Sequence, residues 1–568
     1  MTMEHLIAVA RGDRPADLLL RNARLVNVSS GEIMDTDIAV ADGFIAGFGP
    51  REATAEFDLG GRYLAPGFID AHLHIESAMA SPTEFARAVL PHGTTTVVAD
   101  PHEIANVMGL DGVRYILDAS EGLPLSVYVM APSCVPATHM ETAGAELTAE
   151  DIKELLAHER VLGLAEMMNF PGVLYRVPSV LDKIRIAGNR PVDGHAPGLS
   201  GLDLNAYLVA GIGSDHECTE LEEAREKLRG GMHIFVREGT TARNLDALVP
   251  LVTPANARRF HLCSDDRHPA TLLSEGDIDD TVRKAIAAGL DAITAIQMAT
   301  INTAEYFRLR HLGAVAPGYR ADLLVLDDLD TLQVSQVYTR GTLVAEGGTL
   351  VPSSAAFPRV PIQPSVHVDL SALDLTIEAG PGTARVIGVI PEQVITEDLR
   401  LEPTVQNGKV VSDPSRDLLK IAVVERHRGT GNAGLGLVKG MGLRQGAIAS
   451  SVAHDSHNIV TVGASDSDMR AAVAAIAEMG GGQVVVVTGQ IRAACPLPIA
   501  GLMSDQPLEV VRAQVDRVTE AVRALGCPLP DPLMTLSFLA LPVIPTLKLT
   551  DKGLVDVNRF DFVPLFGE

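Results

Sequence analysis

The chain has 568 residues, 46% of them hydrophobic and 21% charged, with a formal net charge of −26. This length exceeds what one hydrophobic core supports, so we expect two or three domains. The acidic balance disfavours binding to nucleic acid or to anionic membranes. Signal-peptide and membrane-spanning patterns are missing, and the five scattered cysteines indicate no disulfide framework. A cytoplasmic protein that binds neither nucleic acid nor membrane is therefore expected.

The first predicted elements are short strands over residues 17–64. Alternating apolar runs are separated there by the turn signals Ser30-Gly31 and Asp42-Gly43. A similar pattern returns over residues 321–348. We predict that the two flanking segments, residues 1–64 and 313–360, build one small β-sandwich domain.

Between these segments, residues 65–312 alternate strand-like apolar runs with helix-like stretches such as 279–290, which predicts an α/β fold with parallel strands. Eight such units in about 250 residues match the size of a (β/α)8 TIM barrel. The predicted strands end near His74, Ala99, Val129, Glu166, Gly194, His216, Val236 and Asp265.

A Pro-rich linker (Pro352, Pro358, Pro361 and Pro364) leads into the last region. A strand over 484–487 and an amphipathic helix over 468–479 predict a separate α+β domain, residues 365–568. Residues 429–434 match the G-x-G-x-x-G pattern of dinucleotide sites, but the glycines that follow would interrupt the helix that such a site needs. We interpret this segment as a loop.

Potential metal ligands lie at the predicted strand ends. His72 and His74, two residues apart on one strand, point to the same face and can bind one ion together. A hydrogen-bonded pair of buried histidines is the alternative. Glu166, His195 and His216 end other strands, as does Asp265, and the carboxyl ends of barrel strands are where such enzymes build active sites. The joint pattern favours a metal centre.

These residues resemble the ligand set of the amidohydrolase superfamily, and residues 313–323 resemble its usual return to the β domain. The resemblance implies two divalent metal ions per subunit, with Mn or Fe suiting the ligands best and Zn as a further option. It implies His72, His74 and Asp265 as ligands of the first ion, His195 and His216 as ligands of the second, and Glu166 as the bridge. A hydroxide bridging the ions would then attack the substrate, with Asp265 as base.

Four further segments resemble the adenine deaminase family, whose members convert adenine to hypoxanthine and ammonia. They are residues 72–77 (HLHIES), 100–107 (DPHEIANV), 236–239 (VREG) and 446–458 (GAIASSVAHDSHN). Because these segments include both the barrel and the last region, the resemblance covers nearly the whole chain. It implies adenine as the small-molecule substrate, in purine salvage, and a homo-oligomer, namely a homodimer.

Within this resemblance, Glu217 is the candidate acid that protonates a purine ring nitrogen, with a solvated loop carboxylate as the alternative. The candidate substrate-binding residues are His102, Glu103, Arg237, Glu238, His454 and His457. His102 and Glu103 could also line the pocket or hold a further metal, and Arg237 and Glu238 could simply fix their loop.

Two other functions remain open at this point. The same metal hydroxide could hydrolyse an amide, as in an N-acetyl-sugar deacetylase or a cyclic amidase, and a barrel homologue without catalysis is a third possibility. The complete ligand set disfavours the last. Cys263 is interpreted as a small apolar filler of the core rather than as a nucleophile.

Overall fold

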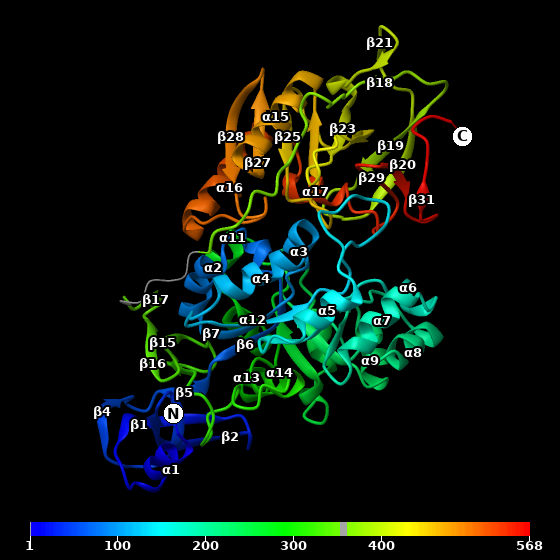
Figure 1. Ribbon diagram of the computed structural model, residues 1–568. Coiled ribbons are helices and arrows are strands. Elements are labelled where there is room, and N and C mark those ends of the chain that lie inside the picture. The colour runs from blue at the N-terminus through cyan, green and yellow to red at the C-terminus, as the bar shows by residue number, and fades with distance from the viewer. Residues whose placement is uncertain (1, 353–359, 568) are drawn as a thin grey trace.

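The computed structural model describes residues 2–352 and 360–567, and the linker residue Pro358 lies outside these ranges. Figure 1 shows three regions in succession: a β-sheet region that contains the N-terminus, a central α/β region, and a C-terminal region on the opposite side of the centre. Within the described residues, no helix has both the length and the apolar composition needed to cross a membrane.

The N-terminal sheet combines strands from both sides of the central region. Its order is β17-β16-β15-β14-β5-β1-β2-β3, with β4 paired to β1. Strand β14 runs antiparallel to β5, with Leu323 opposite Pro66. A short helix, α1 (Met3–Arg11), was not predicted, and it buries Val9 against this sheet. The strands are β1 (Ala16–Asn27), β2 (Glu32–Ala41), β3 (Phe44–Phe48), β4 (Ala53–Asp58), β5 (Tyr63–Pro66), β14 (Leu323–Leu326), β15 (Val334–Thr339), β16 (Thr342–Glu346) and β17 (Thr349–Leu350).

The central region is a curled parallel sheet of the TIM-barrel type. Parallel pairing runs in the orders β10-β9-β8-β7-β6 and β11-β12-β13. The Gly213 amide donates to the Val192 carbonyl, at 2.9 Å, beside β10 and β11, and a parallel bridge between Leu73 and Asp265 joins the first strand to the last. The strands are β6 (Phe68–Leu73), β7 (Thr94–Ala99), β8 (Ser126–Ala131), β9 (Val161–Met167), β10 (Val192–Gly194), β11 (Ser214–Asp215), β12 (His233–Arg237) and β13 (Phe260–Cys263).

Apolar side chains from six of these strands meet in one cluster: Ile69, Val98, Met130, Ala165, Phe235 and Cys263. Side chains from strands that lie around a closed sheet can contact one another only inside it, so this cluster fills the interior and supports the strand ends from below. Cys263 is fully buried there, as expected of a filler.

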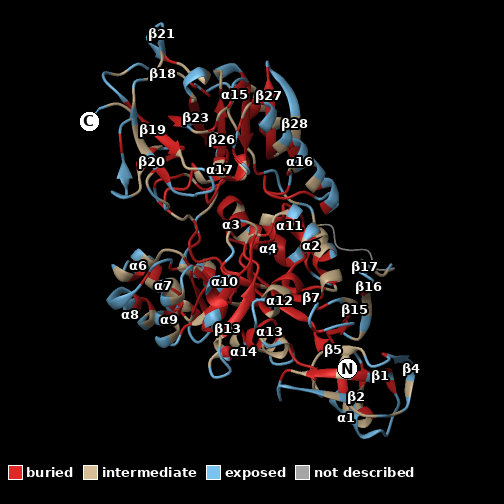
Figure 2. Cartoon of the chain, turned by 180° about the vertical axis from the view of Figure 1, so that it is seen from behind, coloured by how far each residue is buried: buried red, intermediate tan, exposed pale blue. Residues whose placement is uncertain are grey.

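Helices follow the strands and cover the outside of the barrel (Figure 2). They are α2 (Pro82–Val89), α3 (His102–Met108), α4 (Leu110–Ala119), α5 (Ala149–Leu155), α6 (Phe170–Leu174), α7 (Pro178–Ala187), α8 (Gly201–Val209), α9 (Leu221–Arg229), α10 (Leu245–Leu248), α11 (Pro269–Ser274), α12 (Ile278–Ala287), α13 (Ala292–Met298) and α14 (Ile301–Tyr306).

The C-terminal region contains an eight-stranded mixed sheet in the order β20-β19-β24-β23-β26-β25-β27-β28. Its strands are β19 (Ala384–Val389), β20 (Thr396–Leu401), β23 (Leu418–Val424), β24 (Ala433–Lys439), β25 (Ala447–Ser450), β26 (Ile459–Gly463), β27 (Gly482–Val487) and β28 (Gln490–Pro496). The glycine-rich segment 429–434 lies at the turn between β23 and β24, and its last two residues begin β24 rather than a helix. It is therefore a hairpin loop and no dinucleotide site.

Helices and small strands complete this region. The helices are α15 (Asp466–Met479), α16 (Leu508–Ala524) and α17 (Pro532–Phe538), and the small strands are β18 (Ile377–Glu378), β21 (Val405–Gln406), β22 (Lys409–Val410), β29 (Leu547–Thr550), β30 (Gly553–Asp556) and β31 (Asp561–Phe562). A bridge between Ala80 and Ser504, and a 2.8 Å hydrogen bond from the Thr142 amide to Asp551, tie the region to the loops that follow barrel strands. The C-terminal region thus covers the barrel mouth.

Candidate metal centre and adjoining pocket

All six predicted metal ligands meet at the carboxyl ends of the barrel strands. Glu166 lies between two groups: its Oε1 is 3.4 Å from His74 Nε2 and 3.8 Å from His72 Nε2, whereas its Oε2 is 2.6 Å from His195 Nδ1 and 3.2 Å from His216 Nε2. Five of the six residues are buried, and only His195 is partly exposed. The two carboxylate oxygens of Glu166 therefore face different imidazoles, with His72 and His74 on one side and His195 and His216 on the other.

The backbone of Asp265 directs its carboxylate into this cluster. Asp265 has a φ of 54°, in the left-handed region that non-glycine residues rarely adopt, and its amide donates to the His72 carbonyl at 3.0 Å. Its Oδ1 lies 3.1 Å from His74 Nε2 and 3.5 Å from His72 Nε2. The first pair of imidazoles thus has carboxylate oxygens from both Glu166 and Asp265.

This set of donors fits divalent metal ions. His72 Nε2 is buried and has no hydrogen-bond partner among the described residues, although carboxylates surround it. Imidazole nitrogens and carboxylate oxygens are the usual ligands of Mn, Fe and Zn. Burial raises the pKa of Glu166, but the adjacent His195 and His216 outweigh burial and hold this pKa well below its ordinary value. An ionised Glu166 can then bind cations through both oxygens.

Arg237 connects two acids at the edge of the cluster. Its Nη1 donates to Asp265 Oδ2 at 2.7 Å and also to Glu217 Oε1, and its Nη2 donates to Glu217 Oε2 at 3.2 Å. Glu217 Oε1 lies 3.6 Å from His216 Nε2. Burial raises the pKa of Glu217, but His195 and Arg237 lower it more, so the carboxylate is ionised. The two predicted proton carriers, Asp265 and Glu217, therefore share one guanidinium.

Glu238 does not join this cluster. Its carboxylate accepts a hydrogen bond from the Leu245 amide at 3.1 Å and lies 3.4 Å from Lys284 Nζ. Both partners belong to the outer helices α10 and α12, so Glu238 fixes the loop after β12. This is the alternative role that the sequence analysis gives for Glu238.

A second cluster joins the barrel to the C-terminal region. His102 has Nδ1 3.4 Å from Glu166 Oε1 and Nε2 3.4 Å from Glu103 Oε1. Glu103 in turn contacts two histidines of the C-terminal region, with His454 Nδ1 at 2.7 Å and His457 Nε2 in a shorter contact. The predicted residues His454 and His457 are thus connected to the metal ligand Glu166 through Glu103 and His102.

The two histidines carry different charges. The Ala453 amide donates to His457 Nδ1 at 3.1 Å, so the ring proton of His457 is on Nε2 and is donated to Glu103. Burial lowers the pKa of His457 to about 4. Burial also lowers the pKa of His454, but Glu103 outweighs it and raises that pKa to about 9. The contacts from both histidines fix the Glu103 carboxylate, and the three side chains also lie close enough together to hold a metal ion.

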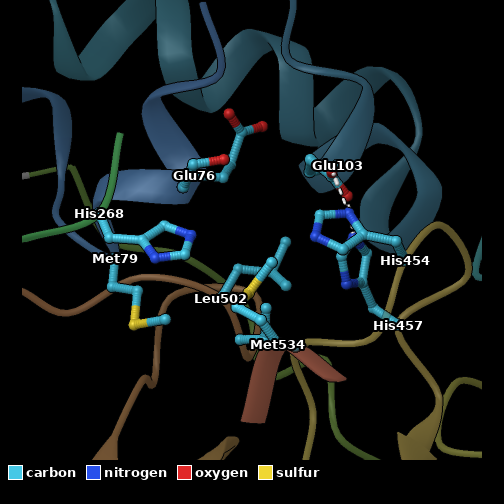
Figure 3. A pocket seen from close by; sticks show the side chains of 10 residues that line it. Glu76, Met79, Glu103, His268, His454, His457, Leu502 and Met534 are labelled. Carbon is cyan, nitrogen blue, oxygen red and sulfur yellow. Dashed lines mark hydrogen bonds and ion pairs between the residues drawn. The ribbon is translucent and has the colours of Figure 1, made fainter. Parts of the chain in front are cut away.

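A pocket lies between this second cluster and the loops after His74 and Asp265 (Figure 3). The apolar side chains of Met79, Leu502 and Met534 line one side, and the His268 ring points into the space. We call this space the inner pocket. It is lined by Glu76, Ser77, Met79, Glu103, His268, Val452, His454, His457, Leu502 and Met534. Apolar walls with a few polar groups are typical of sites that bind small organic molecules.

Three residues near the site were missed by the sequence argument. Glu76 and His268 line the inner pocket, and both carboxylate oxygens of Asp100 are buried without a hydrogen-bond partner in the part of the chain that the structure describes. Glu76 follows His74 by two residues, and His268 follows Asp265 by three. Closeness to a predicted ligand was the available signal, since loop residues after a ligand often line the same mouth.

This curled parallel sheet, with imidazoles and carboxylates at its carboxyl ends, defines a metal-dependent hydrolase of the amidohydrolase type. In agreement, residues 63–344 match the model of the amidohydrolase family. Residues 393–561 match the model of the adenine deaminase C-terminal domain. The chain belongs to the adenine deaminase family.

Curated relatives agree over the full length. The chain is 57% identical to the adenine deaminase of Desulfatibacillum aliphaticivorans, with 100% of both chains covered. It is 53% identical to the adenine deaminase of Oleidesulfovibrio alaskensis, covering 100% of this chain and 99% of the relative. Among solved structures, an enamidase of the amidohydrolase superfamily is 19% identical with a TM-score of 0.46, covering 60% of this chain and 98% of that chain.

Proposed function

We propose that this protein catalyses the hydrolytic deamination of adenine to hypoxanthine and ammonia. The single observation that carries the proposal is the identity of 57% over the full length of a relative named adenine deaminase. The site gives further support, because the metal-ligand side chains meet at the barrel mouth, and His102 joins Glu166 to Glu103 in the wall of a pocket with apolar and polar groups. The chemistry required is addition of water to the ring carbon that bears the amino group.

We further propose two divalent cations per subunit, with Mn or Fe preferred and Zn as a further option. The first cation would be held by His72, His74 and Asp265. The second would be held by His195 and His216, and Glu166 would bind both. The support is that the two oxygens of Glu166 face different imidazole pairs. Such cations, when bound, would lower the pKa of a water molecule in the site and so make hydroxide available near neutral pH.

In this mechanism the chain's own residues move the protons. Asp265 accepts a proton at Oδ1, because Oδ2 already accepts from Arg237, and passes it to the leaving amino group. Glu217 takes the proton released when water ionises and delivers it to a ring nitrogen. One water and one adenine thereby give one hypoxanthine and one ammonia. Arg237 is a positioning residue that donates to both carboxylates and holds them in place.

The inner pocket is the proposed adenine site. Glu103 and His454 offer an acceptor and a charged donor on one side, and His102 connects this wall to Glu166. His457 acts on Glu103 and positions it. Of the predicted substrate-binding residues, Glu238 has the least support, because its carboxylate contacts Leu245 and Lys284 instead.

The domain division follows the same reasoning. We propose a composite β-sandwich domain of residues 1–64 and 313–360, a catalytic barrel of residues 65–312, and an α+β domain of residues 365–568. The pairing of β5 with β14 supports the composite domain, apart from residues 353–359, which lie outside the described ranges. The homodimer and the cytoplasmic location stay predictions.

The test is direct. Protein loaded with Mn or Fe is incubated with adenine, and ammonia release is measured together with the change in purine absorbance. We expect one ammonia for each adenine consumed. Turnover of N-acetyl sugars or cyclic amides, with adenine left intact, would replace deamination by amide hydrolysis as the function.

A further inference from the structure

A second cavity lies beside the inner pocket and opens toward solvent. We call it the outer groove, and it runs between the loop that begins α11 and the helix α16. The residues that line it include Thr240, Gln483, Arg512, Asp516, Thr519 and Asp531. Asp516 is exposed, and Arg512 and Thr519 are partly exposed, so this cavity reaches the surface.

The inner pocket is smaller than the outer groove, and buried side chains make up much of its wall. Glu76, Glu103, His454, His457 and Leu502 are all buried. A substrate therefore needs a passage from solvent to this space.

The two cavities share three lining residues: Met79, His268 and Met534. Met79 and Met534 have unbranched, flexible side chains, which adjust to a passing group more easily than branched ones. In Figure 3 the His268 ring extends into the space from the barrel side, across from the histidines of the C-terminal region. These three residues form the boundary between the outer groove and the inner pocket.

We propose that adenine reaches the metal centre through the outer groove, passing between Met79, His268 and Met534. This inference rests on the proposed function. It means that the C-terminal region forms one wall of the route and one wall of the inner pocket. The route crosses the boundary between the barrel and α16, so neither region alone encloses it.

The chemistry of the outer groove suits a purine base. Val515 and Leu533 supply apolar surface, and Arg512 and Asp516 supply charged groups near the opening. Gln483 Oε1 is buried and has no hydrogen-bond partner among the described residues, so it can accept a hydrogen bond from a purine N–H. A polar atom left unpaired beside a cavity is costly unless a ligand or water satisfies it.

The native cysteines make a sharp test possible, because all five are buried. Thr519→Cys introduces an accessible thiol in the outer groove. Ala513→Cys places an exposed thiol on the same helix, away from the groove, and serves as the matched control. Each metal-loaded variant is treated with a bulky methanethiosulfonate reagent, then with a methyl methanethiosulfonate of minimal size, and finally with a reducing thiol.

We expect the bulky adduct on Thr519→Cys to lower kcat/KM for adenine at least tenfold, and the reducing thiol to restore it. The small adduct, and every adduct on Ala513→Cys, should leave kcat/KM within twofold. Metal content and Tm, measured before and after labelling, separate blockage from unfolding. If Thr519→Cys does not fold, Asp516→Cys replaces it.

Unchanged kcat/KM with a fully labelled groove would overturn the proposed route while leaving deamination intact. If the unlabelled variants and the unmodified protein all fail to deaminate adenine, the proposed function fails instead. The two failures are therefore distinguishable within one experiment.

Discussion

Asp265 is held by contacts on both of its carboxylate oxygens, one to Arg237 and one to the imidazoles of His72 and His74. A residue in this position combines two roles, since it can bind a cation and accept a proton. Its left-handed backbone shows that the surrounding structure keeps it there at some cost in conformational energy.

Replacing Asp265 tests both roles. Asp265→Asn keeps the shape but removes the charge and the ability to take a proton, so kcat for adenine should fall by about 10² to 10⁴-fold. Steady-state kinetics and metal analysis of the same sample measure the two effects. A kcat within threefold of the unmodified protein, at normal metal content, would contradict the proton-transfer role.

Glu217→Gln removes the second proton carrier while retaining the hydrogen-bonding shape. We expect kcat to fall by about 100-fold or more, because an amide cannot deliver a proton to the ring nitrogen. Glu220→Gln, at an exposed position of the same loop, is the control and should leave kcat unchanged. Equal, small effects of both substitutions would assign Glu217 to the solvated loop role.

The metal ligands could be predicted because of where they lie along the predicted strands, and their residue types alone would not have been enough. Glu166, His195 and His216 were identifiable because each ends a strand, and all barrel strands end at one mouth. His268 and Glu76 lie in the loops beyond, where no periodicity fixes the direction of a side chain, so closeness to a predicted ligand was the one signal that pointed to them.

At the scale of elements, helix α9 supports the segments that carry His195 and His216. Lys227 on α9 is completely buried, and its Nζ donates to Asp215 Oδ2 at 3.1 Å and to the Ala196 carbonyl at 2.7 Å. Asp215 precedes His216, and Ala196 follows His195. The Lys227 ammonium group therefore fixes the residues next to His195 and His216.

Lys227→Met should destabilise the protein by about 3 kcal/mol, because Asp215 stays buried without its cation. We expect a lower Tm and a lower content of the second metal ion. Lys153→Met breaks the exposed pair with Glu150 on α5 and should change Tm little. Thermal unfolding and metal analysis of both variants check this, and equal Tm values for the two would show that the buried pair has no special role.

Local patterns predicted most elements of the described chain. The strand over 484–487 lies within β27, and the helix over 468–479 lies within α15. Helix α1 was missed because the first residues were considered only as a possible signal peptide. The contact of Glu103 with His457 spans 354 residues and depends on how the C-terminal region docks, which no local pattern contains.

On the scale of the whole molecule, metal ions should stabilise the fold as well as supply the chemistry. The ligands come from five barrel strands or the residues directly after them, so a bound ion connects segments far apart in the sequence. An ion present at 100 times its Kd contributes about 2.7 kcal/mol to the folded state.

Removing the metal with a chelator should therefore abolish deamination and lower Tm by several degrees, and adding Mn or Fe should restore both. Differential scanning calorimetry and an ammonia assay on the same samples measure this. Loss of activity without any change in Tm would mean that the ligand cluster is already held rigidly by the protein alone.

The contact between Glu103 and the two C-terminal histidines has a consequence for synthesis of the protein. Ribosomes make the barrel with its metal ligands first, and His454 follows the last of these ligands, Asp265, by 189 residues. Until then Glu103 has only the His102 imidazole beside it, and the mouth lacks the wall that the C-terminal region supplies. A chain that terminates before residue 450 can carry every metal ligand and still lack the place where the base would bind.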